Sequence, residues 1–100
     1  MLESQIQKSI MDYLRFNGWF VVKNNTTGIY KKATDSYIPN TAKGQGDLTV
    51  IKDGRVIILE VKNSKGKQSE NQESFQNNWE EHGGEYYVVR SIDDVEKITK

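Results

Sequence analysis

Two carboxylates and a lysine lie in one short stretch that the sequence predicts to be a β-hairpin. Asp47 begins the stretch, Asp53-Gly54 divides it, and Glu60 and Lys62 end it. An Asp-Gly pair between two apolar runs favours a two-residue type I′ turn, because both central positions need positive φ. Counting outward from this turn pairs residues 48–52 with 59–55 and puts Asp47 directly opposite Glu60. Strand alternation directs Lys62 to the same face.

This arrangement has a cost that suggests a purpose. Like charges directly opposite each other destabilise a sheet, and burial adds a desolvation penalty for each carboxylate. Two carboxylates with Cβ atoms about 5 Å apart are suited to a hard divalent cation such as Mg²⁺. Lys62 could orient or deprotonate a water, or offset charge on a phosphate. The alternative is a set of exposed ion pairs. We favour the metal site because Glu60 follows an apolar run, residues 56–59, typical of a buried strand.

Length and composition limit the other possibilities. One hundred residues form one domain, 1–100, with a modest core, and an enzyme this small is expected to be an oligomer. The absence of cysteine excludes disulfides and Cys-ligated metal sites. No apolar run approaches the length of a membrane span, and no signal peptide is evident. We therefore expect a soluble, cytoplasmic protein that does not bind a membrane.

The net charge of zero conceals an asymmetry along the chain. Residues 23–67 carry nine Lys or Arg against four acids, a net charge of +5, whereas residues 68–100 carry eight acids against three bases, a net charge of −5. A basic middle that contains an acid pair suggests a polyanionic substrate brought to a metal. A mixed, solvated surface is the alternative, but it gives no reason for the bases to gather around the hairpin.

The N-terminal part of the chain should form a helix and then a strand. Residues 2–17 have an apolar stripe at helical spacing, which Gly18 ends. Glu3 lies along the edge of this stripe. It could complement the helix dipole in the first turn, or supply a third carboxylate to the metal, and spacing alone does not separate the two roles. Residues 19–23 read as a strand.

A long connection, residues 24–46, follows that strand and has little apolar sequence. Connections of this length are usually functional or mobile. Side chains in it that suit phosphate contact or base stacking are Lys31, Lys32, Lys43, Tyr30 and Tyr37. A surface excursion with no function is the alternative. The glycines that precede Asp47 would allow a backbone or a ligand to approach closely.

The C-terminal part adds a helix, a strand and a short helix. Ser69 and Gln72 match a capping box for a helix that runs to about Glu81. Gln72 could cap this helix, or aim its amide at a water or a phosphate, but could not easily do both. Residues 86–89 form a strand, which a right-handed crossover places parallel to residues 55–62. The predicted fold is α/β with a mixed sheet, in the order α-β-β-β-α-β-α.

The ordered set Glu3, Gly46-Asp47, Glu60-Val61-Lys62 and Gln72 resembles the VRR-Nuc (virus-type replication and repair nuclease) domain of the PD-(D/E)XK superfamily, in its short stand-alone phage form. The resemblance implies a restriction-endonuclease-like core in which Asp47, Glu60 and the Val61 carbonyl bind Mg²⁺ or Mn²⁺, supported by Glu3. It implies that Lys62 assists the attacking water and that Gln72 belongs to the catalytic set. The proline of the superfamily name is replaced here by Gly46.

The same resemblance implies a metal-dependent DNA endonuclease. Stand-alone members of the family are associated with homodimers that act on branched DNA, so the expected function is that of a four-way (Holliday) junction resolvase. If the chain is phage-encoded, it would act in the host cytoplasm. The alternatives are a flap or nicking nuclease, as in larger relatives, and a non-catalytic DNA-binding module with a nuclease fold. A sequence-specific restriction enzyme would normally need recognition segments for which 100 residues leave little room.

Overall fold

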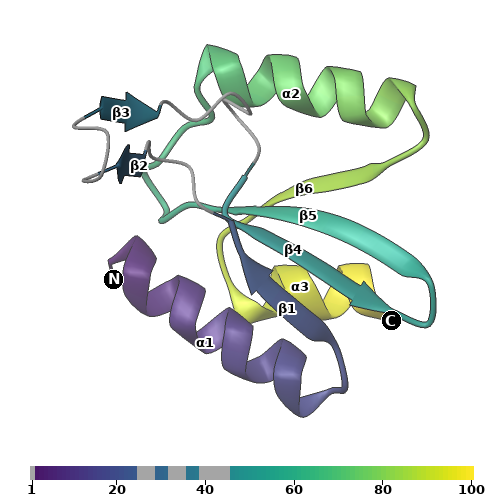
Figure 1. Ribbon diagram of the computed structural model, residues 1–100. Coiled ribbons are helices and arrows are strands. Elements are labelled where there is room, and N and C mark those ends of the chain that lie inside the picture. The colour runs from purple at the N-terminus through teal and green to yellow at the C-terminus, as the bar shows by residue number, and fades with distance from the viewer. Residues whose placement is uncertain (1, 25–28, 32–35, 39–45) are drawn as a thin grey trace.

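The computed structural model describes residues 2–24, 29–31, 36–38 and 46–100, and Figure 1 shows their arrangement. A four-stranded mixed sheet has the strand order β1-β4-β5-β6. Helices α1 and α3 lie on one side of this sheet and α2 lies on the other. The elements of this three-layer core are α1 (Glu3–Phe16), β1 (Phe20–Lys23), β4 (Leu48–Lys52), β5 (Arg55–Val61), α2 (Glu70–Glu81), β6 (Glu85–Val89) and α3 (Ile92–Thr99).

The predicted hairpin is confirmed. Asp53 and Gly54 have φ angles of 51° and 83°, as a type I′ turn requires. Antiparallel pairing of β4 with β5 runs from Lys52↔Arg55 to Leu48↔Leu59, which is the predicted register. The ladder ends there, so Asp47 lies just beyond the last pair and is positioned by other contacts, described below.

The crossover is also confirmed. Strand β6 pairs in parallel with β5, from Ile57↔Glu85 to Val61↔Val89, and α2 connects them across one face of the sheet. The predicted element order fits, with one addition in the long connection. Two three-residue strands, β2 (Ile29–Lys31) and β3 (Ser36–Ile38), form a separate antiparallel sheet. The rest of that predicted loop, residues 25–28, 32–35 and 39–45, lies outside the described residues.

The main core lies between the sheet and the α1/α3 layer. Helix α1 contributes Ile6, Ile10 and Leu14, whereas Leu2, which the sequence pattern placed in the same stripe, is 65% exposed. The buried strand residues facing these side chains include Val21, Val50, Ile57, Leu59, Val61 and Val89, and α3 adds Val95. Alternation along β5 therefore turns residues 57, 59 and 61 toward this core and residues 58, 60 and 62 toward the α2 side.

Helix α2 covers only part of its face of the sheet. No residue of α2 is fully buried, and its aromatic side chains contact β6, with Phe75 near the rings of both Trp79 and Tyr86. The predicted capping box is present, since Ser69 Oγ accepts from the Gln72 amide and Gln72 Oε1 accepts from the Ser69 amide. Within the described ranges, none of the helices has the length and apolar character needed to cross a bilayer.

Candidate active site

Asp47 is held against the end of β5 by main-chain contacts. Its amide donates to the Leu59 carbonyl at 3.0 Å, and its carboxylate oxygen Oδ2 accepts from the Val61 amide at 2.8 Å. These two bonds reach either side of Glu60, so they bring Asp47 beside that residue even though the regular ladder ends at Leu48. The predicted proximity of the two acids is therefore present, but it depends on a bend rather than on a β-pair.

Glu60 is the buried carboxylate of this site. Glu60 is only 3% exposed, and its Oε2 atom has no hydrogen-bond partner among the described residues. Burial, and then the negative charge of Asp47, raise the pKa of Glu60 from its usual 4.5 to about 7, whereas the positive charge of Lys62 opposes this shift. The Lys62 Nζ atom lies 3.4 Å from Glu60 Oε1. The structure thus brings together the three residues that the hairpin count selected.

Gly46 packs closely against the residues around the carboxylates. Its φ is +96°, and a Cβ atom built there would lie 2.7 Å from Ile58 Cγ2 and 3.6 Å from Glu60 Oε2. A side chain at this position would therefore both strain the backbone and press on the site. Close approach, which the sequence suggested for the glycines before Asp47, is observed for this glycine.

Asn24, which directly follows β1, fixes the bend from a third strand, a role that the sequence pattern does not predict. Its amide donates to the Asp47 carbonyl at 2.8 Å, and its side chain accepts from Thr49 Oγ1 at 3.0 Å. Its Nδ2 also approaches the Gly46 carbonyl at 3.4 Å. An Asn after an apolar strand is a weak signal, because its role depends on pairing with residues more than twenty positions later.

A second unpredicted group lies between β6 and α2. Tyr86 is 1% exposed, and burial, followed by the negative charge of Glu60, raises its pKa to about 12, opposed by a hydrogen bond with Gln68. Gln68 Nε2 donates to Gln76 Oε1 at 2.8 Å, and Gln76 Nε2 approaches the Tyr86 carbonyl at 3.5 Å. Tyr86 is therefore part of the interior, whereas its neighbour Tyr87 is partly exposed.

The remaining predicted site residues are placed differently. Gln72 is engaged in the capping box, which was the structural alternative for it. Glu3 is exposed at the first residue of α1. Among the residues that the structure describes, no three His, Cys, Asp or Glu side chains gather into a potential metal site. The described site therefore presents two carboxylates and a lysine, without Glu3 as a third acid.

The donors present fit a hard divalent cation. Carboxylate oxygens are the ligands that Mg²⁺ and Mn²⁺ prefer, and buried polar atoms without a partner are rare in folded proteins. Glu60 Oε2 is such an atom among the described residues, and the Asp47 carboxylate lies on the same side of the sheet. The Asp47 carboxylate is already oriented by Val61, so a cation between the two acids would compensate their charges.

Exposed basic residues follow the site on the loop between β5 and α2. Lys65 and Lys67 are exposed there, and Arg90, after β6, is exposed beside them. The side chains of Tyr30, Lys31 and Tyr37, and the whole of Lys32 and Lys43, lie outside the described part of the chain. The site thus has cations on at least one side, as the charge asymmetry predicted.

Comparison with known proteins identifies the family. A family model for the nuclease-related domain (NERD) matches residues 3–100. A solved structure described as a VRR_NUC domain has a TM-score of 0.72 to this chain at 22% identity, covering 97% of this chain and 92% of that one. No curated protein matches the sequence significantly. The chain therefore belongs to the nuclease-related domain family, and its fold is that of a VRR-Nuc-like nuclease domain.

Proposed function

We propose that this domain is a divalent-metal-dependent endodeoxyribonuclease that cuts branched DNA, with a four-way junction as its substrate and a homodimer as its active form. The observation that carries the proposal is the buried Glu60 carboxylate, with Oε2 unpaired among the described residues and with Asp47 and Lys62 beside it. Such a site is unfavourable for a purely structural role, because each buried charge costs free energy unless it is compensated.

Each residue has a distinct task in phosphodiester hydrolysis. Asp47 and Glu60 would hold Mg²⁺ or Mn²⁺, with the Val61 carbonyl as a further proposed ligand, whereas Glu3, exposed at the start of α1, does not join them in the described site. A cation held there would polarise the scissile phosphate and lower the pKa of water in the site. Lys62 donates a hydrogen bond that orients the attacking water, and its charge offsets the negative charge that develops on the phosphate.

The DNA would be bound through its backbone. Exposed cations around the site, including Lys65 and Lys67, favour phosphate contacts that do not read sequence. Resolution of a four-way junction needs two symmetric cuts, whereas one domain supplies one site. A dimer with two-fold symmetry would present two sites in opposite orientation and would match the symmetry of the junction.

The proposal is tested by cleavage of three substrates in the presence and absence of Mg²⁺: a linear duplex, a flap and a four-way junction. We expect metal-dependent cleavage that is strongest on the junction, with paired nicks at symmetric positions. Lys62→Ala should nearly abolish cleavage. Preference for the flap, or a single unpaired nick, would favour the alternative of a flap or nicking nuclease. Failure of the wild type to cut any of these substrates would favour a DNA-binding module.

Metal binding can be measured without activity. Calorimetric titration with Mn²⁺ should show binding to the wild type and to Lys62→Ala, and a large loss of affinity in Asp47→Ala. Asp12→Ala is the matched control, since Asp12 is an exposed acid on α1 whose only described ion pair is with Lys8. Equal affinities of the wild type and Asp47→Ala would refute the assignment of this carboxylate as a ligand.

A further inference from the structure

The loop that follows Lys62 is closed on itself by Asn63. The Asn63 side-chain oxygen accepts from the amides of Lys65 and Gly66, at 3.0 and 2.8 Å. The Gly66 amide also donates to the Asn63 carbonyl at 3.2 Å. Residues 63–66 therefore form a compact turn of the kind that Asn side chains stabilise. This turn begins at the residue immediately after Lys62.

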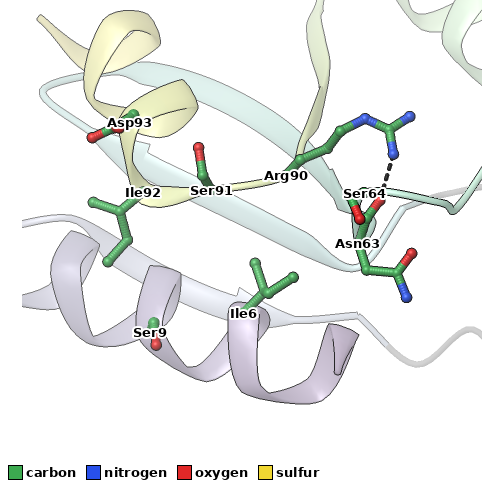
Figure 2. Close-up of a pocket in the computed structure, with 8 residues that line it drawn as sticks. All are labelled: Ile6, Ser9, Asn63, Ser64, Arg90, Ser91, Ile92 and Asp93. Carbon is green, nitrogen blue, oxygen red and sulfur yellow. Dashed lines mark hydrogen bonds between the residues drawn. The ribbon is translucent and has the colours of Figure 1, made fainter. Parts of the chain in front are cut away.

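Arg90 holds this turn from a different part of the chain. Figure 2 shows its guanidinium reaching from the β6–α3 connection to the main chain of Asn63. Its Nη1 atom donates to the Asn63 carbonyl at 2.5 Å and to the Gly66 carbonyl at 2.7 Å. The backbone of Arg90 is itself fixed, because its amide donates to Asp94 Oδ2 in the first turn of α3 at 2.8 Å.

The pocket drawn in Figure 2 lies next to this contact but does not contain the catalytic groups. It has a volume of about 410 Å³, and Ile6 and Ser9 of α1 form one wall while residues 90–93 form another. Asp47, Glu60 and Lys62 do not line it. Asn63 and Ser64 of the turn line this pocket together with Arg90. The turn, which begins directly after Lys62, is therefore the part of the pocket wall that connects to the proposed chemistry.

Gly66 is the point at which the turn meets Lys62. A Cβ atom built on Gly66 would lie 3.2 Å from Lys62 Cδ and 3.3 Å from Lys62 Cβ, so the glycine leaves just enough space for the stem of the lysine. The backbone of Lys62 is held as well, because its amide donates to the Val89 carbonyl at 3.0 Å. Both the main chain and the stem of Lys62 therefore depend on residues 89–90 and on the turn that Arg90 grips.

We propose that Arg90, acting through the 63–66 turn and the surface of Gly66, is a positioning residue for Lys62 and aims its Nζ atom at the site beside Glu60. The proposal rests on the proposed nuclease function for its catalytic consequence, but not for its geometry. It assigns a role to Gly66 that depends on size rather than on backbone conformation, since Gly66 does not have the positive φ of Gly46 or Gly54.

Gly66→Ala tests the contact directly. The added methyl group requires the lysine stem to shift by a few tenths of an ångström. In metal-free protein, the Lys62 Cε and Nζ resonances in lysine side-chain correlation spectra should move, while the amide spectrum of the sheet stays the same. In single-turnover cleavage, the rate at saturating protein should fall by about tenfold, because small displacements of a catalytic group are costly. The half-saturating protein concentration should change little.

Arg90→Ala tests the hydrogen bonds from Arg90 to the 63–66 turn, with Lys65→Ala as its comparison. Both variants remove one positive charge next to the same turn, so both should weaken DNA binding. Only Arg90→Ala removes the donor to Asn63 and Gly66, so only it should shift the Lys62 resonances and lower the rate at saturation. Arg90→Lys, which restores a donor and the charge, should recover part of both effects.

The outcomes separate the two proposals. Unchanged Lys62 resonances in both Gly66→Ala and Arg90→Ala would overturn the positioning role, whatever the cleavage activity. Equal effects of Arg90→Ala and Lys65→Ala, confined to DNA affinity, would also overturn it. If the wild type cuts none of the DNA substrates, the proposed function fails, whereas the resonance shifts still decide whether Arg90 and Gly66 position Lys62.

Discussion

Substitution of Gly46, the glycine next to the acid pair, by alanine should strongly lower the free energy of unfolding. Two costs add at this position. The backbone has φ +96°, and holding a residue other than glycine there costs about 1 kcal/mol or more. The new Cβ atom would also lie 2.7 Å from Ile58 Cγ2, and overpacking of a buried side chain costs about 1–3 kcal/mol. We therefore expect Gly46→Ala to lose about 3 kcal/mol of unfolding free energy.

The matched controls are Gly54→Ala and Gly83→Ala. Both glycines have positive φ, 83° and 90°, but an added Cβ atom would meet nothing within 4 Å at either position. These controls carry the backbone cost alone, about 1 kcal/mol. The measurement is urea unfolding, with the three variants compared at similar m-values.

The difference between Gly46→Ala and the two controls isolates the contact with Ile58. This side chain is 2% exposed and packed on all sides, so it has little room to move away. If all three variants lose the same free energy, the contact is not restrictive and the argument for close approach at Gly46 is wrong. If Gly46→Ala folds, its affinity for Mn²⁺ should also be lower than that of the wild type, because the methyl group presses on the bend that carries Asp47.

Three further predictions use other parts of the molecule. Ser69→Ala should lose about 1 kcal/mol of stability and keep cleavage, whereas Gln72→Ala should lower cleavage more than stability; identical behaviour would leave Gln72 with a capping role only. Arg55 holds the pKa of Glu85 at about 2 instead of 4.5, so its stabilisation is present above pH 4.5 and lost as the pH falls toward 2. Glu85→Gln should remove about 1 kcal/mol of this pH-dependent stability, allowing for solvent screening, and an unchanged acid-unfolding curve would contradict it. Light scattering at micromolar concentration should give twice the chain mass, and a monomer mass would contradict the dimer.

The parts of the fold that could be predicted are those governed by local rules. The turn at Asp53-Gly54 determines its own conformation, and the pairing of β4 with β5 follows from it by counting. The cap at Ser69 lies three residues from the amide that it binds. The parallel position of β6 follows from the handedness of crossovers. In each case the deciding interaction is short in sequence or is general to the geometry of polypeptides.

The parts that could not be predicted depend on contacts between distant residues. Asn24 reaches Asp47 and Thr49 only because β1 pairs with β4. Gln68 meets Tyr86 only after α2 has crossed the sheet. The strands β2 and β3 have three residues each, which is too short for period-two alternation to separate them from a loop. Leu2 shows the opposite kind of error. The apolar pattern of the helix includes Leu2 and so predicts its burial, but the helix buries only the residues further along this face.

The acid pair illustrates why a candidate site can be recognised in a sequence while the residues that support it cannot. Asp47 and Glu60 violate the rule that like charges are kept apart and solvated, and this violation shows in the hairpin count before any contact is known. Their supports violate nothing. An Asn at a strand end, a Gly in a polar loop and an Arg after a strand are all ordinary at their positions. The importance of these three residues is seen only in the folded structure, where three segments meet. These segments are the Gly46-Asp47 bend, the end of β5 and the 63–66 turn to which Arg90 donates hydrogen bonds. The residues proposed to position Lys62 are therefore identified by substitutions chosen from the structure. Gly66 has no reactive side chain, so Gly66→Ala adds a single methyl group and tests the proposed positioning of Lys62 directly.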